Sequence, residues 1–269
     1  MIVVAGGLSS VDRDTFTPLE RQIYDEMNES NVPLYYTSLT DLMFELGMRA
    51  HIVESAEALS QSGIRFSDFS RSQCNDAYWI RTPNGGFRLR YGIPSADGIR
   101  DIFANGNLYS TECATAVVIV LYHGVLQSIG DNSFNANFAD LLLYDWQYDQ
   151  DLKLYTKKKA DGVFPGDVVY FKNPGYDPRT PWWIGENTIK LLGDQYYGHG
   201  AGIKSEEEMI SNLNDRRAPN SQISAYMSND IVGIDYPFMM KLAAWNGPAL
   251  APNLRMFYRP SISAQHGFN

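Results

Sequence analysis

The sequence predicts an α+β fold in which one long, buried helix packs on a sheet. Residues 113–130 are apolar on nearly every face, and a run of 18 residues is long for a strand, so a central helix is expected there. Helical patterns precede this segment, strand patterns at 141–146 and 166–174 follow it, and helices return near the end. Because strands and helices do not alternate one by one, we expect an antiparallel sheet in one domain that spans 1–269.

The N-terminal segment is polar and expected to be irregular, apart from a short helix over 18–27. A longer helix should begin after Ser38, because Ser38 and Asp41 have the spacing of a capping box. It should end at Gly63, which is typical of a helix C-terminus, and Gly47 is the point at which it could divide.

The middle of the chain begins with a predicted hairpin over 78–91. Ser95 is expected to cap a short helix that ends near Gly106. The central helix follows, with Ser110 or Thr111 as its expected N-cap.

The C-terminal half should begin with the two strands that follow the central helix. A hairpin is then expected over 185–203, with a two-residue turn at Gly193-Asp194. Ser205 should cap a helix that runs to about Leu213, and a last helical stretch is expected over 236–245.

Charge and composition exclude several classes of function. The chain has 22 basic and 31 acidic residues, hence a net charge of −9, which argues against nucleic acid as a partner and mildly favours lysine-bearing proteins. The apolar run at 114–122 is too short to span a membrane, and the N-terminus lacks the features of a signal peptide, so a cytoplasmic protein is expected. No glycine-rich phosphate loop and no metal-ligand spacing occur, so neither a cofactor nor a metal is predicted.

Cys113 is the strongest candidate for chemistry, whereas Cys74 is expected to be a loop or edge residue. In the first turn of a buried helix, unpaired N–H groups could stabilise the Cys113 thiolate and receive an oxyanion. The alternative is a small, inert core cysteine. The adjacent Glu112 could act as a base or could simply be an acidic residue suited to a helix start.

A nucleophilic cysteine needs a base, and His199 is the best-placed histidine. His123 lies ten residues along the same helix, about 15 Å away, and His51 and His266 fall in regions expected to be structural or peripheral. The two-residue turn would pair Thr188 with His199 and put Glu186 on the same face. The alternative is that Glu186 belongs to a solvated face of the hairpin.

Several motifs together resemble the small transglutaminases of endospore-forming bacteria. They are ECATA (112–116), LYDW (143–146), YFKNP (170–174), GEN (185–187) and HGAGI (199–203), supported by 42–49, 99–106 and 134–138. The resemblance covers a core of about 38–215. The N-terminal arm (1–37) and the C-terminal tail (217–269) match less closely.

The resemblance implies a papain-like core that needs no calcium, with a tunnel that glutamine and lysine enter from opposite sides. It places the nucleophile at Cys113, the main acidic partner at Glu186, a second carboxylate at Glu112 and a neighbouring histidine at His199. The implied substrates are proteins of the spore coat that carry glutamine and lysine. The implied location is the mother-cell cytoplasm, in association with that coat.

The expected reaction is acyl transfer in two halves. Cys113 would attack a glutamine carboxamide and release ammonia, and a lysine amine would then convert the thioester to an isopeptide bond, with Glu186 as the base and Glu112 in reserve. Two alternatives remain open: a papain-like cysteine amidase or peptidase, and a non-catalytic coat scaffold. In a cysteine peptidase of the cell-wall type the histidine usually comes before its polar partner, whereas here Glu186 precedes His199.

Overall fold

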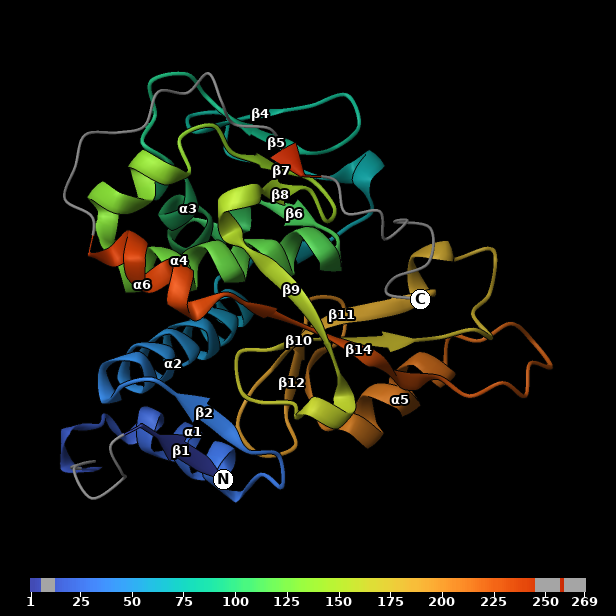
Figure 1. Cartoon of the computed structure of the whole chain (residues 1–269). Helices are drawn as coiled ribbons and strands as arrows, with labels where there is room; N and C mark the ends of the chain where they lie inside the picture. The colour runs from blue at the N-terminus through green and yellow to red at the C-terminus, as the bar shows by residue number, and fades with distance from the viewer. Residues whose placement is uncertain (6–12, 245–256, 259–269) are drawn as a thin grey trace.

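The computed structural model describes residues 1–5, 13–244 and 257–258 (Figure 1). The helices are α1 (Pro18–Glu29), α2 (Leu39–Gln61), α3 (Ser95–Ala104), α4 (Cys113–Asn137), α5 (Glu206–Asn214) and α6 (Tyr236–Ala243). The largest sheet has the order β13-β12-β11-β10-β14-β9, and every neighbouring pair in it is antiparallel. The predicted α+β class is therefore confirmed.

Five of the six strands of this sheet lie between residues 154 and 204, and one comes later. Their bounds are β9 (Leu154–Lys158), β10 (Val168–Lys172), β11 (Gly185–Lys190), β12 (Tyr196–Gly198), β13 (Gly202–Lys204) and β14 (Tyr226–Ile234). Smaller sheets join β1 (Ile2–Val4) to β2 (Leu34–Tyr36), β3 (Arg65–Phe66) to β6 (Ser110–Thr111), β15 (Phe257–Tyr258) to β8 (Tyr148–Asp149), and β4 (Trp79–Arg81), β5 (Phe87–Leu89) and β7 (Leu142–Leu143) to one another.

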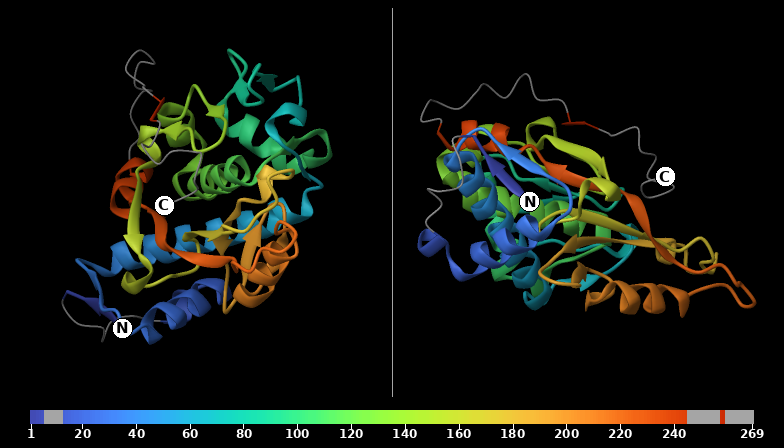
Figure 2. Two further views of the ribbon diagram at one scale, coloured as in Figure 1. Left: turned by 90° about the vertical axis from the view of Figure 1, so that its right-hand side faces the viewer. Right: turned by 60° about the horizontal axis from the view of Figure 1, so that its bottom comes forward.

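The central helix α4 is the core of the molecule, as predicted. It packs between α2, α3, α6 and β11, and Figure 2 shows it in green above the blue α2. Of its most apolar 18-residue window, 72% is buried inside the protein, so a helix long and apolar enough to cross a membrane serves here as a core helix. Gly130 leaves the helical conformation with φ 77°, which puts a kink in α4.

The start of α4 differs from the prediction. Glu112 is the N-cap, and Ser110 and Thr111 instead form β6, which pairs in parallel with β3. Glutamate is not among the preferred N-cap residues, which is why the sequence pointed to the hydroxyl side chains. The consequence is that Glu112 is directly engaged with the helix that carries Cys113.

The two N-terminal helices confirm most of the prediction for their region. Thr17 begins α1 with a complete capping box, and Ser38 caps α2 through the N–H of Asp41. The helix α2 runs unbroken through Gly47, so the suggested division there is wrong. The described residues before Ser38 are less irregular than expected, because β1 and β2 pair in parallel and α1 packs on α2.

Other elements agree with the prediction in kind and differ in detail. The hairpin of β4 and β5 and the capping box of Ser205 on α5 are confirmed, as is a helix at 236–243; residue 245 lies outside the described residues. Ser95 is not the N-cap of α3: Pro94 holds that position, and Asn135 Oδ1 accepts from the Ala96 N–H at 2.8 Å in place of a local cap.

The β11–β12 hairpin has a different register from the predicted one. Thr188 pairs with Gly198 rather than His199, and the turn contains three residues, since the Leu191 N–H donates to the Gln195 carbonyl. A shift of one residue reverses the face on which a side chain lies. His199 and Glu186 are therefore on opposite faces, which corrects the prediction that they share one.

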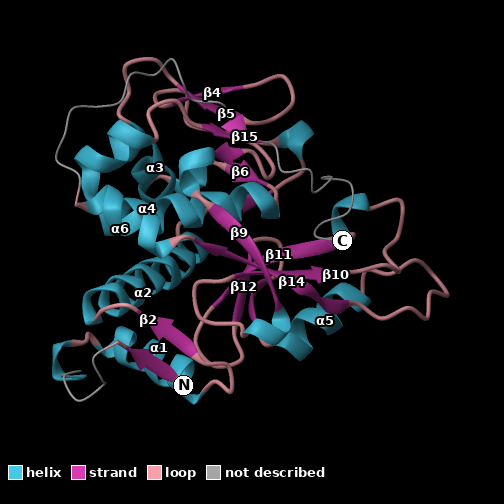
Figure 3. Ribbon diagram, in the orientation of Figure 1, coloured by secondary structure: helices cyan, strands magenta, loops and turns pink. Residues whose placement is uncertain are grey.

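The large sheet is covered on both sides at its centre. Ile189 and Leu191 pack with α4, whereas Val169 and Phe171 pack with Met209 and Leu213 of α5. Figure 3 and the right-hand view of Figure 2 show α5 on the outer side of the strands. All six residues of β11 are buried, so the solvated-face alternative for Glu186 is wrong.

Candidate active site

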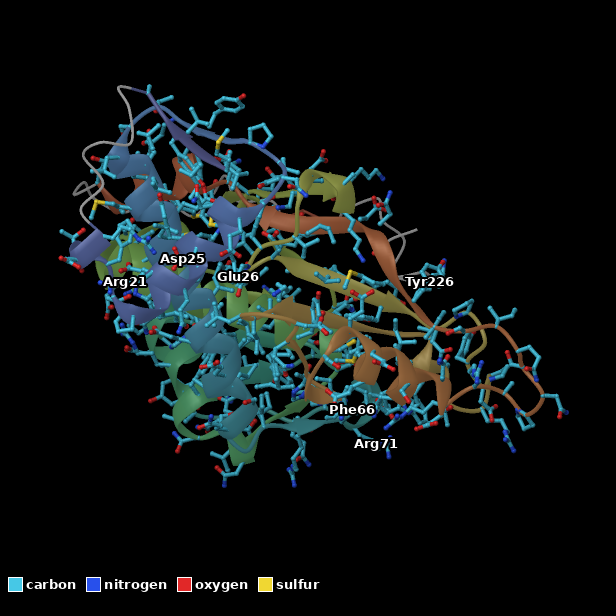
Figure 4. The ribbon with its side chains drawn as sticks, turned by 90° about the horizontal axis from the view of Figure 1, so that it is seen from below. Arg21, Asp25, Glu26, Phe66, Arg71 and Tyr226 are labelled. Atoms are coloured by element: carbon cyan, nitrogen blue, oxygen red, sulfur yellow. The ribbon has the colours of Figure 1, made fainter. Side chains whose placement is uncertain are left out.

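Cys113 is the first residue of α4 and lies half-buried in a cleft of about 310 Å³. Five aromatic and three acidic side chains are among those that line it, and no lysine or arginine lines the cleft among the described residues. The aromatic side chains are Phe66, Phe69, Trp146, Tyr170 and Trp182, and the carboxylates are Asp68, Glu112 and Asp145. Phe66, labelled in Figure 4, comes from β3 and stacks on Trp183 with ring centroids 5.7 Å apart.

Glu112 holds the end of the helix that carries the thiol. Its two carboxylate oxygens accept from the N–H groups of Ala114, at 2.6 Å, and Thr115, at 2.7 Å. Burial raises the pKa of Glu112 to about 7, and the nearby carboxylate of Asp145 adds to the rise. Two of the N–H groups expected to receive an oxyanion are therefore already occupied.

The Cys113 thiol is not the low-pKa group that its helix position predicts. Burial raises its pKa well above the ordinary value, and the charges of Glu186 and Glu112 raise it further. The dipole of α4 is met at its N-terminus by the Glu112 carboxylate, which offsets its effect on the sulfur. The thiol is thus protonated near neutral pH, and its activation requires a base.

Glu186 is the buried carboxylate whose charge has the largest effect on that thiol. It is 1% exposed, and its Oε1 accepts from the Gly200 N–H at 3.0 Å. Burial raises its pKa to about 8, with a further rise from the charge of Glu112, while Arg216 lowers it. A group with this pKa can both take up and release a proton near neutrality.

Two glycines make room for Glu186. A Cβ on Gly198 would lie 2.7 Å from Glu186 Cγ, and a Cβ on Gly200 would lie 3.0 Å from its Oε2. Any side chain at either position would press against the carboxylate arm. Gly200 of the HGAGI motif and Gly198 of β12 therefore leave the space that the Glu186 side chain occupies.

His199 lies near the site and is held by other partners. Its Nε2 contacts the Arg65 carbonyl and its Nδ1 the Tyr197 hydroxyl, both at 3.2 Å. The carbonyl requires a proton on Nε2, so Nδ1 accepts from the tyrosine. Burial lowers the pKa of His199 to about 4, which makes it neutral at physiological pH, and among the described residues no hydrogen bond joins it to Cys113 or Glu186.

The remaining histidines and the second cysteine have structural surroundings. Ser128 bonds the Nδ1 of His51 at 2.9 Å and Ser55 bonds that of His123 at 2.7 Å, in the interface of α2 and α4. Cys74 is partly buried against the core, and burial raises its pKa to about 11. His266 lies outside the described residues, and no group of three or more metal-binding side chains occurs within them.

Two residues that the sequence did not single out lie in the cleft. Asn187 donates from Nδ2 to Cys113 Sγ at 3.4 Å, the one hydrogen bond to the thiol from a side chain in the described part of the chain. Asp145 has φ 53°, unusual for a residue other than glycine, and its N–H donates to Thr115 Oγ1 at 2.8 Å. The motifs GEN and LYDW contained both residues, but no pattern of spacing pointed to them.

Comparison with known proteins identifies the family. Residues 1–243 match the family model described as "TGL: Protein-glutamine gamma-glutamyltransferase". Proteins of that name from Bacillus cereus (strain B4264) and Bacillus mycoides (strain KBAB4) are 46% and 45% identical over 235 residues, which are 87% of this chain and 85% of each relative. A solved structure, "Transglutaminase from Geobacillus stearothermophilus (without C-terminal extension)", is 44% identical with a TM-score of 0.73, over 76% of this chain and 98% of that one. The chain therefore belongs to the protein-glutamine gamma-glutamyltransferases and is a transglutaminase, an enzyme that crosslinks proteins through their glutamine and lysine side chains.

Proposed function

We propose that the enzyme transfers the γ-glutamyl group through a thioester on Cys113, with Glu186 as the principal base. The observation that supports this most strongly is the position of the thiol. It lies at the start of α4 within a cleft that Glu112 lines, and its pKa is raised by the charges of Glu112 and Glu186, two buried carboxyl groups whose own pKa values are about 7 and about 8. The helix-borne thiol packed beside a sheet is also the arrangement of a papain-like core, which we propose for this domain.

The first half of the reaction forms the thioester. Glu186 and the sulfur-bonding Asn187 lie on opposite faces of β11, and no hydrogen bond in the described residues joins Glu186 to the thiol, so Glu186 takes the thiol proton through water. The sulfur then attacks the carbonyl carbon of the glutamine carboxamide. The tetrahedral intermediate collapses as the C–N bond breaks, and the same proton passes from Glu186 to the departing nitrogen, which leaves as ammonia. A raised pKa suits this exchange, because an ordinary glutamic acid would seldom hold the proton at neutral pH.

The second half consumes the thioester. The carboxylates of the cleft attract a lysine ammonium, and its aromatic walls exclude water that would otherwise hydrolyse the intermediate. Since the amine has a pKa near 10.4, it must lose a proton to become a nucleophile. Glu186 accepts that proton, with Glu112 in reserve, and attack on the carbonyl carbon gives the isopeptide bond and the free thiol.

His199 is better suited to a supporting role than to proton transfer. A neutral imidazole fixed between Tyr197 and the Arg65 carbonyl connects β12 to β3. Since β3 pairs with β6, and β6 leads directly to Cys113, this contact bears on the position of the thiol. We therefore propose that His199 keeps the walls of the site in register.

The natural substrates and location are also proposals. The resemblance to the enzymes of endospore-forming bacteria favours proteins of the spore coat as substrates and the mother-cell cytoplasm as the place of action. The Bacillus and Geobacillus origin of the relatives agrees with this. Crosslinked coat protein in wild-type spores but not in spores of a Cys113→Ala strain would support it.

A paired assay on purified protein tests the reaction. A glutamine-bearing protein is supplied with and without a fluorescent primary amine, and ammonia release and label incorporation are followed together. Cys113→Ala serves as the blank, and Cys74→Ala is the matched control for loss of a thiol. Both signals should depend on Cys113 and survive Cys74→Ala. Ammonia release without incorporation would indicate a hydrolase, and neither signal from folded protein would indicate a scaffold.

A further inference from the structure

Asn187 lies between Glu186 and Thr188 on β11 and is 5% exposed. Side chains alternate along a strand, so Asn187 points to the face opposite Glu186, toward α4. There its Nδ2 donates to Cys113 Sγ at 3.4 Å, and the residue lines the cleft. A single side-chain amide is thus in contact with the sulfur that must meet the substrate.

The other end of that amide has no partner. Asn187 Oδ1 is buried and accepts no hydrogen bond from any residue that the structure describes. A buried oxygen left unpaired is unfavourable by about 1–3 kcal/mol, and such atoms in native proteins require an explanation. At an enzyme's reacting centre, a hydrogen-bond donor on the substrate is a direct explanation.

The geometry of attack brings such a donor to this oxygen. The carbonyl carbon of a glutamine carboxamide must approach the sulfur to about 3–3.5 Å before the bond forms. The NH₂ group of the substrate is bonded to that carbon and therefore lies near the sulfur. Asn187 Oδ1 also lies near the sulfur, because it belongs to the amide whose Nδ2 contacts Sγ. The oxygens of Glu112 already accept from Ala114 and Thr115, which leaves Asn187 Oδ1 as an acceptor held beside the thiol without a donor of its own.

We propose that Asn187 recognises the primary carboxamide of the substrate, with Oδ1 accepting from the NH₂ group while Nδ2 holds the sulfur. The proposal rests on the proposed acyl transfer through Cys113 and adds the group that selects its donor substrate. A glutamate side chain offers no N–H and carries a charge that the oxygen repels, and an ester likewise cannot donate. Asn187 therefore favours glutamine over both in the step that forms the thioester.

The test compares two donors that yield the same acyl-enzyme. One is a short N-protected glutamine peptide, measured by ammonia release. The other is the same peptide with the γ-nitrophenyl ester of glutamate in place of glutamine, measured by nitrophenolate release. Each is measured with wild type, Asn187→Ala and Asn187→Leu, the second of which keeps the size of the side chain. Ile189→Val, on the same face of β11 outside the cleft, is the control for disturbing the strand. Taking the ratio of the two kcat/KM values cancels any effect on the thiol itself, including loss of the bond to Sγ.

Both Asn187 variants should lower the amide-to-ester ratio of kcat/KM by about 10- to 100-fold, the range expected for loss of one hydrogen bond in a closed site. Ile189→Val should leave the ratio unchanged, and the division of the acyl-enzyme between water and an added amine should be the same in all four proteins. An unchanged ratio in either Asn187 variant would overturn the proposal: a parallel loss on both donors would make Asn187 a residue that only positions the thiol. A wild-type enzyme that turns over the ester but never the glutamine peptide would instead overturn the proposed function.

Discussion

Replacing Gly198 by alanine tests how closely the sheet holds Glu186. The new Cβ would lie 2.7 Å from Glu186 Cγ, whereas carbon atoms in contact are normally about 3.5–4.0 Å apart. Gly198 has an ordinary backbone conformation, so the substitution acts through this contact and not through φ. The carboxylate arm must retreat by about 1 Å, and a displacement of that size can cost a catalytic group about 100-fold in rate.

The assay is kcat for amine incorporation, with the free energy of unfolding measured in urea on the same samples. Gly198→Ala should lose about 10- to 100-fold in kcat and about 1–3 kcal/mol in stability, the usual range for overpacking. Gly233→Ala is the control, because the nearest contacts of its Cβ would be with the ring of the exposed Tyr155, at 3.0 Å, and not with a residue of the site. A folded Gly198→Ala enzyme with wild-type kcat would refute the assignment of Glu186 as a closely held base.

Three further predictions concern charge. Burial raises the pKa of Glu186 from 4.5 to about 8, so its contribution to stability is complete below pH 4.5 and is lost as the pH rises to about 8. Glu186→Gln should therefore gain stability over wild type as the pH rises across this window. A difference in unfolding free energy between the two proteins that stays constant with pH, measured in urea, would contradict this. The raised thiol pKa predicts that iodoacetamide labels Cys113 slowly at pH 7 and ever faster with rising pH, in a Cys74→Ala background; a rate already at its plateau below pH 8 would show a thiolate instead. Asp167→Asn should cost about 1.5–3 kcal/mol in urea unfolding, because it removes the charge that pairs with the buried Arg49 at 3.1 Å and with Lys157 at 2.7 Å, while Arg49 keeps Glu45 at 2.8 Å; a loss below about 0.5 kcal/mol would mean that the pairs contribute little.

The order of the main helices was predictable from the sequence, because the apolar pattern agrees with the residues that typically begin and end helices. A segment of 18 residues that is apolar on nearly every face leaves few choices other than a buried helix, and Ser38, Ser205 and Gly63 mark helix ends through local chemistry. These signals require no knowledge of the partners that each element packs against.

The predictions that were wrong depend on contacts between distant segments. Gly47 does not break α2, since glycine within a helix is tolerated where tertiary packing supports it. Asn135 satisfies the start of α3 from α4, and no local pattern could reveal this. The extra residue in the turn after β11 shifted the register by one, which exchanged the faces of His199 and its neighbours.

The same limit applies to the site. Cys113, Glu112 and Glu186 were predicted from their positions and from motifs and stay predictions as catalytic residues; a raised pKa for a buried glutamate was foreseeable, but the raised pKa of the thiol was not. The low thiol pKa expected from a helix N-terminus assumed free N–H groups, which Glu112 occupies. Asn187 looked like one more polar residue in a strand, and only its contact with Sγ distinguishes it.

The most direct test of acyl transfer through Cys113 is the intact mass of the enzyme after acid quenching with a glutamine peptide and no amine. Transfer through a thioester predicts a covalent adduct on Cys113 with the mass of the peptide less one ammonia. The adduct should be absent in Cys113→Ala and lost when a primary amine is added, with a matching yield of isopeptide product. Amine incorporation by Cys113→Ala, or an adduct on any other residue that turns over to product, would contradict it.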